Sequence, residues 1–286
     1  MAYWILKNVN PQYVAYFFID INTFATQQIQ PSIHYYNVKL LAMKIFIAIM
    51  IVLAGNCFTS CNSQQKNAEN TANTDTGYTY HKASADGIGK YYFGREISHV
   101  MGASGSDWLE RDERNEEENT ELAIEKIKIP ATGVIADIGA GTGYYSFKLS
   151  SKVPQGKVFA VEVQDEMIQL LQQKKVTLKD SIVEIVKGGI MTPNLPENSV
   201  DIAIMVDVYH ELEYPQQMLQ AIYKALKFNG KILLLEYRGE DPSIPIKALH
   251  KTTVAQLNKE MEATGFILSY KGDFLPIQHF LLYQKK

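Results

Sequence analysis

Residues 137–146, DIGAGTGYYS, carry the residue types and spacing best suited to binding a ligand. They follow a short apolar run, 134–136, that predicts a buried parallel strand, and they lead into a helical pattern. Three glycines alternate with other residues, which lets the backbone approach a ligand where a Cβ would clash: Gly139, Gly141 and Gly143. A dinucleotide-binding turn needs its third glycine at the place of Tyr144. The turn, with Asp137 ahead of it, therefore favours a ligand with a positive charge and no phosphate.

A second carboxylate stands where a ribose would need one. Residues 157–163 predict the next strand, and Glu162 lies near its end, 19 residues after Gly143. A carboxylate at the end of the second strand can accept hydrogen bonds from both ribose hydroxyls. An ordinary tight turn with a solvated strand end is the alternative. The order of strand, turn, helix, strand and carboxylate favours a nucleoside-binding site.

Residues 207–211, DVYHE, form the richest chemical cluster of the chain. Imidazole is a common general base, and the carboxylates of Asp207 and Glu211 could orient that of His210, which predicts a catalytic group with His210 as general base. Alternatively, the segment only caps the following helix and packs the loop. Adjacent His and Glu lack the spaced ligand set of a stable metal site, so we predict no metal. Whether His250 approaches in space does not follow from the linear sequence.

From about residue 86 to 286, the chain resembles the class I, seven-stranded methyltransferases that depend on S-adenosylmethionine. The resemblance rests on the glycine turn, on Glu162, and on a final hairpin with no helix between its strands. It implies an α/β fold with a doubly wound, mostly parallel sheet of order 3-2-1-4-5-7-6, the last strand antiparallel and helices on both faces. The strands are expected near 134–138, 158–162, 182–187, 201–206, 231–237, 266–271 and 278–284, with a turn at Asn229-Gly230 before the fifth.

Within that family, the chain is similar to predicted bacterial methyltransferases of unsettled substrate, through blocks 107–111 and 206–211. The resemblance implies S-adenosylmethionine as cofactor, with Asp137 at its methionine end and Glu162 at its ribose. The segment after the third strand would cover the adenine through apolar and backbone contacts. The predicted cofactor-binding residues are Asp137, Gly139, Ala140, Gly141, Gly143, Glu162, Val163, Gly189, Ile190 and Asp207.

A small-molecule acceptor is expected beyond the carboxyl ends of the parallel strands. The predicted substrate-binding residues are Trp108, Tyr209 and Arg238, although Arg238 could instead pair with Glu240 or Asp241. The acceptor would be a quinone-like, phenolic or other nucleophilic metabolite. The alternative, from another functional class, is a lipid-anchored protein that binds a nucleoside or metabolite without turnover.

Residues 86–130 are expected to form an N-terminal helical cap and substrate segment ahead of the methyltransferase domain, 131–286, because the resemblance implies acceptor recognition before the first strand. Its aromatic stretch, 91–99, predicts a helix that packs on the sheet. Its charge run, 107–121, predicts a solvated helix face, with a lid as the alternative. The net charge of −3 and a pI near 6.1 argue against a nucleic-acid partner.

The N-terminal part predicts a leader and a tether. Residues 43–61 resemble a lipoprotein-type signal segment with Cys61 as the acylated residue, because the apolar run is too short to span a bilayer. An uncleaved, membrane-associated helix is the alternative. The polar stretch 62–85 predicts a flexible linker. We expect residues 1–42 to be a mis-assigned extension, with the true start at Met43. We therefore expect a membrane-anchored protein of the cell envelope, with a cytoplasmic location still open.

Overall fold

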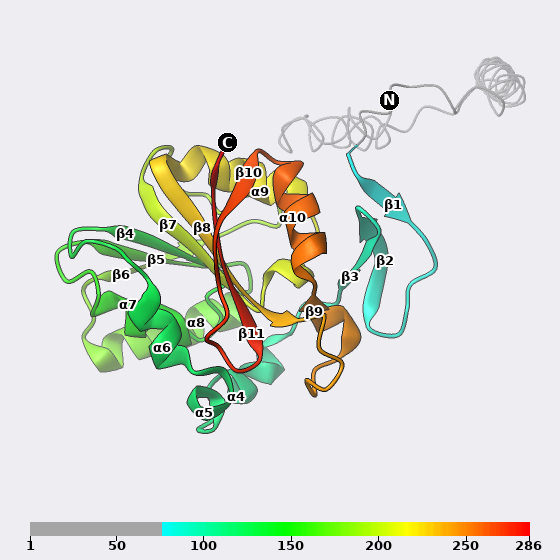
Figure 1. The fold of residues 1–286 in the computed structure, drawn as a ribbon. Coiled ribbons are helices and arrows are strands. Elements are labelled where there is room, and N and C mark those ends of the chain that lie inside the picture. The colour runs from blue at the N-terminus through cyan, green and yellow to red at the C-terminus, as the bar shows by residue number, and fades with distance from the viewer. Residues whose placement is uncertain (1–75) are drawn as a thin grey trace, which may run out of the picture. The chain divides into compact units, whose positions relative to one another are not determined.

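A seven-stranded, mostly parallel sheet forms the centre of the part that the computed structural model describes, residues 76–286 (Figure 1). Its order is β10-β11-β8-β7-β4-β5-β6, and only β11 runs antiparallel to its neighbours. This is the predicted order 3-2-1-4-5-7-6 read from the opposite edge. The strands are β4 (Val134–Ile138), β5 (Lys157–Glu162), β6 (Val183–Lys187), β7 (Val200–Val206), β8 (Leu226–Arg238), β10 (Phe266–Gly272) and β11 (Gln278–Lys285).

Helices cover both faces of this sheet, because successive side chains of a strand point to opposite faces. In β8, Leu234 joins a core with α9 (Pro215–Ala225) and α10 (Val254–Glu262). Its neighbour Leu233 joins a second core with α6 (Thr120–Lys126), α7 (Tyr144–Ser150) and α8 (Asp165–Leu178). The near-continuous apolar strands are thus buried on both sides, as a parallel sheet requires.

The sequence predicted a turn at Asn229-Gly230 before the fifth strand. In the structure these two residues lie within β8, at an irregularity of its pairing with β7. Val200 of β7 pairs with Leu226, whereas Ile202, two residues on, pairs with Lys231. The intervening residues of β8 therefore bulge from the ladder. Beyond its other end, β8 pairs in parallel with the short β9 (Lys251–Thr252).

Residues 78–98 form a three-stranded antiparallel sheet, which corrects the prediction of a linker up to residue 85 and a helix over 91–99. Its strands are β1 (Tyr78–Tyr80), β2 (Gly87–Tyr92) and β3 (Arg95–Ser98). Phe93 and Gly94, both with positive φ, make the two-residue turn that joins β2 to β3. Such a turn matches the twist of a hairpin, and it overrides the helix-like spacing of the aromatic residues.

The predicted helical cap is helical only in its later part. A 3-10 turn, η1 (Ala103–Gly105), leads into α4 (Ser106–Leu109), α5 (Arg114–Glu118) and then α6. There are two further 3-10 turns in this part of the chain. The first, η2 (Tyr209–Glu211), follows β7, and the second, η3 (Ala248–His250), precedes β9. Within residues 76–286, no helix has both the length and the apolar character needed to cross a membrane. The proposed signal segment and Cys61 lie outside the described residues.

Candidate active site

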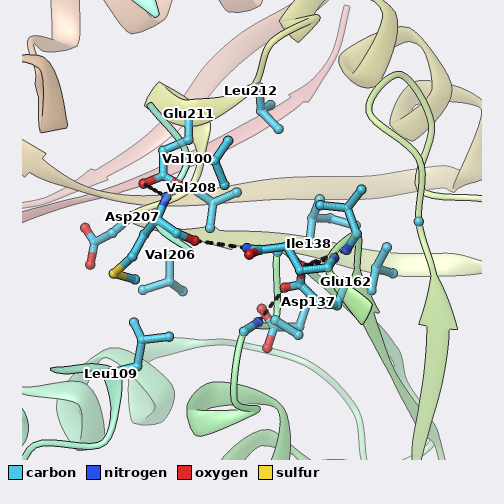
Figure 2. Close-up of a pocket in the computed structure, with 18 of the residues that line it drawn as sticks. Val100, Leu109, Asp137, Ile138, Glu162, Val206, Asp207, Val208, Glu211 and Leu212 are labelled. Atoms are coloured by element: carbon cyan, nitrogen blue, oxygen red, sulfur yellow. Dashed lines mark hydrogen bonds between the residues drawn. The ribbon is translucent and has the colours of Figure 1, made fainter. Parts of the chain in front are cut away.

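A cavity opens at the carboxyl ends of β4, β5, β6 and β7 (Figure 2). Asp137 and Glu162 reach it from the ends of β4 and β5, and Asp207 and Glu211 from the segment after β7. Apolar side chains complete its wall: Val100, Leu109, Val206, Val208 and Leu212. In open α/β sheets this edge is the usual place for a ligand.

The glycine turn after β4 is held by backbone hydrogen bonds to the neighbouring strand. The amides of Gly139 and Ala140 donate to the carbonyl oxygen of Val161 at 2.9 and 3.0 Å. The φ angle of Gly139 is +72°, and a Cβ there would lie 2.6 Å from the side chain of Val208. Only glycine therefore fits at this position of the turn.

Nine of the ten predicted cofactor-binding residues line the cavity, and Gly143 does not. Its amide donates to the carbonyl oxygen of Ala140, and a Cβ would lie 2.6 Å from Phe147 and 2.7 Å from Leu171. Gly143 therefore permits the close packing of α7 against α8.

The carboxylate of Glu162 is buried and held by three backbone amides. Oε2 accepts from Gly141 at 2.9 Å, and Oε1 accepts from Val163 at 2.7 Å and Gln164 at 2.9 Å. An ionised carboxylate offers about four acceptor positions, so capacity remains for a hydroxyl of a ligand. The amides fix the orientation of the carboxylate before any ligand arrives.

Asp137 is buried beneath the glycine turn. Its Oδ2 accepts a hydrogen bond of 2.6 Å from the hydroxyl of Ser146 in α7. Burial raises the pKa of Asp137 from 3.8 to about 6, while the hydroxyl of Ser146 and the positive charge of Arg114 act in the opposite direction. A cationic ligand would favour the ionised form.

The opening of the cavity beyond β5 and β6 is apolar. Val163 and Ile190 both line it, and their exposed fractions are 39% and 51%. Gly188 and Gly189 bring the backbone close beside them. Flat, exposed apolar surface of this kind suits an aromatic base, in agreement with the predicted adenine contacts.

A polar region lies at the other side of the cavity, around Asp207. Gln278 donates to Oδ2 of Asp207 at 2.7 Å, whereas the buried Oδ1 has no hydrogen-bond partner in the described part of the chain. Burial, together with the charges of Glu118 and Glu236, raises the pKa of Asp207 well above 3.8. The hydroxyl of Tyr145, which also lines the cavity, likewise has no partner within residues 76–286. Both atoms are fully buried beside the cavity.

Arg114 is a cavity residue that the sequence analysis missed. It is buried, with Nε donating to Glu118 and Nη1 to the carbonyl oxygen of Leu109 at 2.8 and 2.9 Å. Glu118 is fully buried and also accepts from Arg111 and Tyr237. The charge run is therefore not simply a solvated face; the i,i+4 spacing of arginine and glutamate in α5 was the available signal.

Four predicted site residues lie away from the cavity lining: Trp108, Tyr209, His210 and Arg238. Trp108 stacks on the guanidinium of Arg111, at 3.9 Å. The buried Tyr209 donates its hydroxyl to Glu260, and Arg238 donates to backbone carbonyls of the segment before β11. None of these contacts involves the predicted partners Glu240 and Asp241.

His210, which is 1% exposed, belongs to a separate polar network. Its Nδ1 lies 2.6 Å from Oε2 of Glu236, and its Nε2 lies 3.1 Å from Nδ1 of His250. Nε2 of His250 in turn lies 3.1 Å from Oδ2 of Asp86, and burial lowers the pKa of His250. The network meets the cavity at Glu211, whose Oε1 accepts from the amide of Met101 and whose pKa burial raises to about 7.

Parts of the chain are similar to known proteins. Residues 136–234 match a family model described as a methyltransferase domain. An uncharacterised methyltransferase-like protein of Schizosaccharomyces pombe is 29% identical over 126 residues, 44% of this chain and 46% of that protein. A demethylmenaquinone methyltransferase of Oceanobacillus iheyensis is 28% identical over 114 residues, 40% of this chain and 48% of that enzyme. The chain thus spans about half the length of these relatives.

Solved structures show the same fold. A methyltransferase from Aquifex aeolicus, described as dependent on S-adenosylmethionine, superposes with a TM-score of 0.62 at 22% identity, covering 65% of this chain and all of that one. An O-methyltransferase from neocarzinostatin biosynthesis, in complex with S-adenosylhomocysteine and 1,4-dihydroxy-2-naphthoic acid, gives a TM-score of 0.55 at 15% identity over 64% of this chain and 58% of that one.

The fold and the cavity define a class of protein, the doubly wound α/β enzymes that bind a nucleoside cofactor at the carboxyl edge of the sheet. The methyltransferase-domain match over residues 136–234 and the fold shared with a methyltransferase dependent on S-adenosylmethionine support the resemblance to the class I methyltransferases. S-adenosylmethionine is the cofactor of that class.

Proposed function

We propose that this protein transfers the methyl group of S-adenosylmethionine to a hydroxyl of a small, partly apolar acceptor of the phenol or quinol kind. One observation carries the proposal: a single cavity joins the glycine turn and Glu162 to apolar walls and a polar group with unpaired atoms. A demethylmenaquinone methyltransferase among the relatives, and a fold neighbour bound to a dihydroxynaphthoic acid, support the acceptor class.

The cofactor would lie along the glycine turn. Glu162 would accept from a ribose hydroxyl with its remaining acceptor capacity, and Asp137 would face the ammonium of the methionine end. Val163 and Ile190 would pack on the adenine. The methyl group would then point toward the region between Leu109, Leu212 and Asp207.

Methyl transfer asks mainly for positioning and exclusion of water, because the sulfonium is already a good leaving group. The acceptor oxygen forms its bond to the methyl carbon as the carbon–sulfur bond breaks, and S-adenosylhomocysteine leaves as a neutral thioether. The hydroxyl proton needs an acceptor. We assign this role to Asp207 rather than to His210, because Asp207 lines the cavity and its buried Oδ1 has no hydrogen-bond partner within residues 76–286, while the imidazole of His210 lies outside the cavity lining and is engaged by Glu236 and His250.

Cofactor binding is tested by calorimetric titration of the full chain with S-adenosylmethionine and S-adenosylhomocysteine, with NAD as the control ligand. Binding of the first two alone is expected. Glu162→Gln should weaken both, since it replaces a carboxylate oxygen that would accept from the ribose. Equal binding of NAD, or unchanged affinity in the variant, would contradict the cofactor placement.

The role of Asp207 is tested with Asp207→Asn. Turnover of a phenol or quinol acceptor should fall by roughly 100-fold or more, the usual contribution of a positioned general base, while cofactor affinity changes little. Asp165→Asn, at an exposed aspartate of α8, is the matched control and should keep full turnover. Full activity of Asp207→Asn would remove it as the base. Tight cofactor binding without turnover of any acceptor in a panel of phenols and quinols would favour the binding-protein alternative.

A further inference from the structure

Three side chains of the metal-ligand types meet at the edge of the cavity. His210 and Glu211 come from η2 and His250 from η3, and one ligand atom of each lies within 4.8 Å of the other two. Nε2 of His210 and Nδ1 of His250 are 3.1 Å apart. Oε1 of Glu211 lies 3.9 Å from the first nitrogen and 3.8 Å from the second.

The outer nitrogen of each ring is close to a carboxylate. Glu236 lies 2.6 Å from Nδ1 of His210, and Asp86 lies 3.1 Å from Nε2 of His250. A neutral imidazole has only one N–H, and the carboxylate of Glu236 would hold that of His210 on its outer nitrogen, Nδ1. Nε2 of His210 then presents a lone pair toward Nδ1 of His250 at 3.1 Å. Either an N–H on His250 or a cation bound by both inner nitrogens would satisfy this contact.

The charges around the pair are negative overall. Three carboxylates, those of Asp86, Glu211 and Glu236, surround the two rings, and one ammonium, that of Lys247, pairs with Asp86 at 2.7 Å. Arg95, the nearby guanidinium, is already paired with Glu260. The carboxylates therefore outnumber the one ammonium, and a bound cation would offset the excess negative charge.

We propose that His210, Glu211 and His250 bind a divalent transition-metal cation, for which Zn²⁺ is the best match. Two imidazoles and one carboxylate form a ligand set that zinc accepts at about 2.0–2.2 Å, and tetrahedral geometry places such donors about 3.3 Å apart. The two nitrogens, 3.1 Å apart, are close to this separation, whereas Oε1 of Glu211, at 3.9 and 3.8 Å from them, is about half an ångström too far. Carboxylates behind both histidines are the usual support of such ligands.

The site has a place for one more ligand. Zinc sites with three protein ligands hold water or a substrate atom at the fourth position, whereas structural sites are closed by four protein ligands. Because Glu211 also lines the methyl-transfer cavity, the cation would lie at the wall of that cavity. This inference does not depend on cofactor binding, so each proposal can fail without the other.

The test is zinc binding by the full chain, purified without a histidine tag and without added cofactor. We expect one zinc per chain after dialysis, and visible absorption bands of tetrahedral Co²⁺ after replacement with cobalt. His250→Asn should lower zinc affinity by more than about 100-fold, and Asp86→Asn by about 10- to 100-fold, the range for the carboxylate behind a ligand. His250 is less buried than His210, so its replacement threatens folding less.

The matched control is His279→Asn. His279 is also buried and also pairs with a carboxylate, that of Glu240 at 3.0 Å, but it lies outside the three-residue group. This variant should keep one zinc per chain and the cobalt spectrum. If the native chain held no more zinc than His250→Asn, or if His279→Asn lost the metal equally, the proposal would be overturned and a proton shared by His210 and His250 would explain their approach.

Discussion

At the residue scale, the three glycines of the turn after β4 serve different purposes. Gly139 has a positive φ and no room for a Cβ beside Val208. At Gly141 a Cβ would meet only the end of the Leu109 side chain, at 2.9 Å, and Leu109 belongs to α4. Gly143 allows α7 to approach α8. The shape of the cofactor site therefore depends most directly on Gly139.

Gly139→Ala is predicted to weaken S-adenosylmethionine binding by at least about 10-fold, because the left-handed conformation costs an L-residue roughly 1–2 kcal/mol and Val208 must also move. The matched control is Gly94→Ala, with a φ of +95° and open space around the added methyl group. It carries the backbone strain but should leave affinity unchanged. Calorimetry on both variants checks this, and equal affinity in both would contradict the role of Gly139.

Asp137 is predicted to make cofactor binding depend on pH. Its pKa is about 6 in the free protein, with Ser146, Arg114 and Glu162 as its polar and charged neighbours. A cationic cofactor favours the carboxylate, so affinity should rise between pH 5 and pH 7 and then level off. Titrations across this range measure the effect. Asp137→Asn should bind weakly with no such rise; the same pH profile in the variant would assign the effect to another group.

The same rise in the pKa of Asp137 predicts that the free energy of unfolding depends on pH. The pKa of Asp137 rises on folding, from 3.8 to about 6. Between pH 3.8 and about pH 6, Asp137 is therefore protonated in the native state but ionised in the unfolded state. The contribution of Asp137 to the free energy of unfolding therefore falls as pH rises from about 4 to about 6, by about 3 kcal/mol in total. Denaturant unfolding of the native chain and of Asp137→Asn at pH 4.5 and 7 measures it, and a pH-independent difference between them would refute it.

At the scale of elements, α5 closes one side of the cavity through a buried ion-pair group. Glu118 accepts from Arg111, Arg114 and Tyr237, each at 2.8 Å. Tyr237 belongs to β8, so the group ties the helical cap to the sheet. The pKa of the Tyr237 hydroxyl is raised by burial and by the charges of Asp207 and Glu118. The cap is thus attached by polar contacts at the cavity itself.

Glu118→Gln is predicted to lower the free energy of unfolding by about 3–5 kcal/mol, because it leaves the buried charge of Arg114 without its partner. The matched control is Glu117→Gln, one residue earlier, whose side chain is 49% exposed and which pairs with Arg111 at the surface. That change should cost less than about 1 kcal/mol. Denaturant unfolding compares the two variants. Similar losses of free energy would show that the buried ion-pair group contributes no more to stability than the surface pair does.

At the scale of the whole molecule, the described residues 76–286 belong to one compact unit, and residues 136–234 of it match a methyltransferase domain. For the preceding segment we propose a lipid anchor on Cys61, from the lipoprotein-type pattern of residues 43–61. An anchored domain would be held close to lipid-soluble acceptors, which fits the proposed quinol class. The anchor and the methyl-transfer reaction are separate proposals, because Cys61 lies outside the described residues.

Cys61→Ser is predicted to abolish incorporation of labelled fatty acid and to release the protein from the membrane fraction. Cys57→Ser, four residues earlier, is the control and should be acylated normally, since Cys57 would be removed with the leader. Labelling of the Cys61→Ser variant at the native level would exclude the lipoprotein assignment and favour an uncleaved, membrane-associated helix.

Much of the fold and of the cofactor site follows from the sequence alone. Three features of the fold and the site are local patterns, each encoded within about ten residues. They are the buried parallel strands, the glycine turn and the carboxylate at the end of the next strand. These patterns predicted the parallel strands and grouped Asp137, Glu162 and Asp207, which line one cavity, whereas the strand order was implied by the resemblance to the class I methyltransferases. The hairpin over 87–98 was also encoded locally, in the Phe93-Gly94 turn, but the helix-like spacing of its aromatic residues concealed it.

Only the tertiary structure decided the environment of the remaining polar residues. It buried Arg114 with Glu118, turned Tyr209 toward Glu260, and placed His250 against His210 across 40 positions of sequence. Burial and partner choice depend on which distant segments meet after the sheet closes, and no local pattern specifies that. The sequence determined the cofactor-binding edge of this protein because backbone geometry is local, whereas the charges beside it were decided by packing between distant segments.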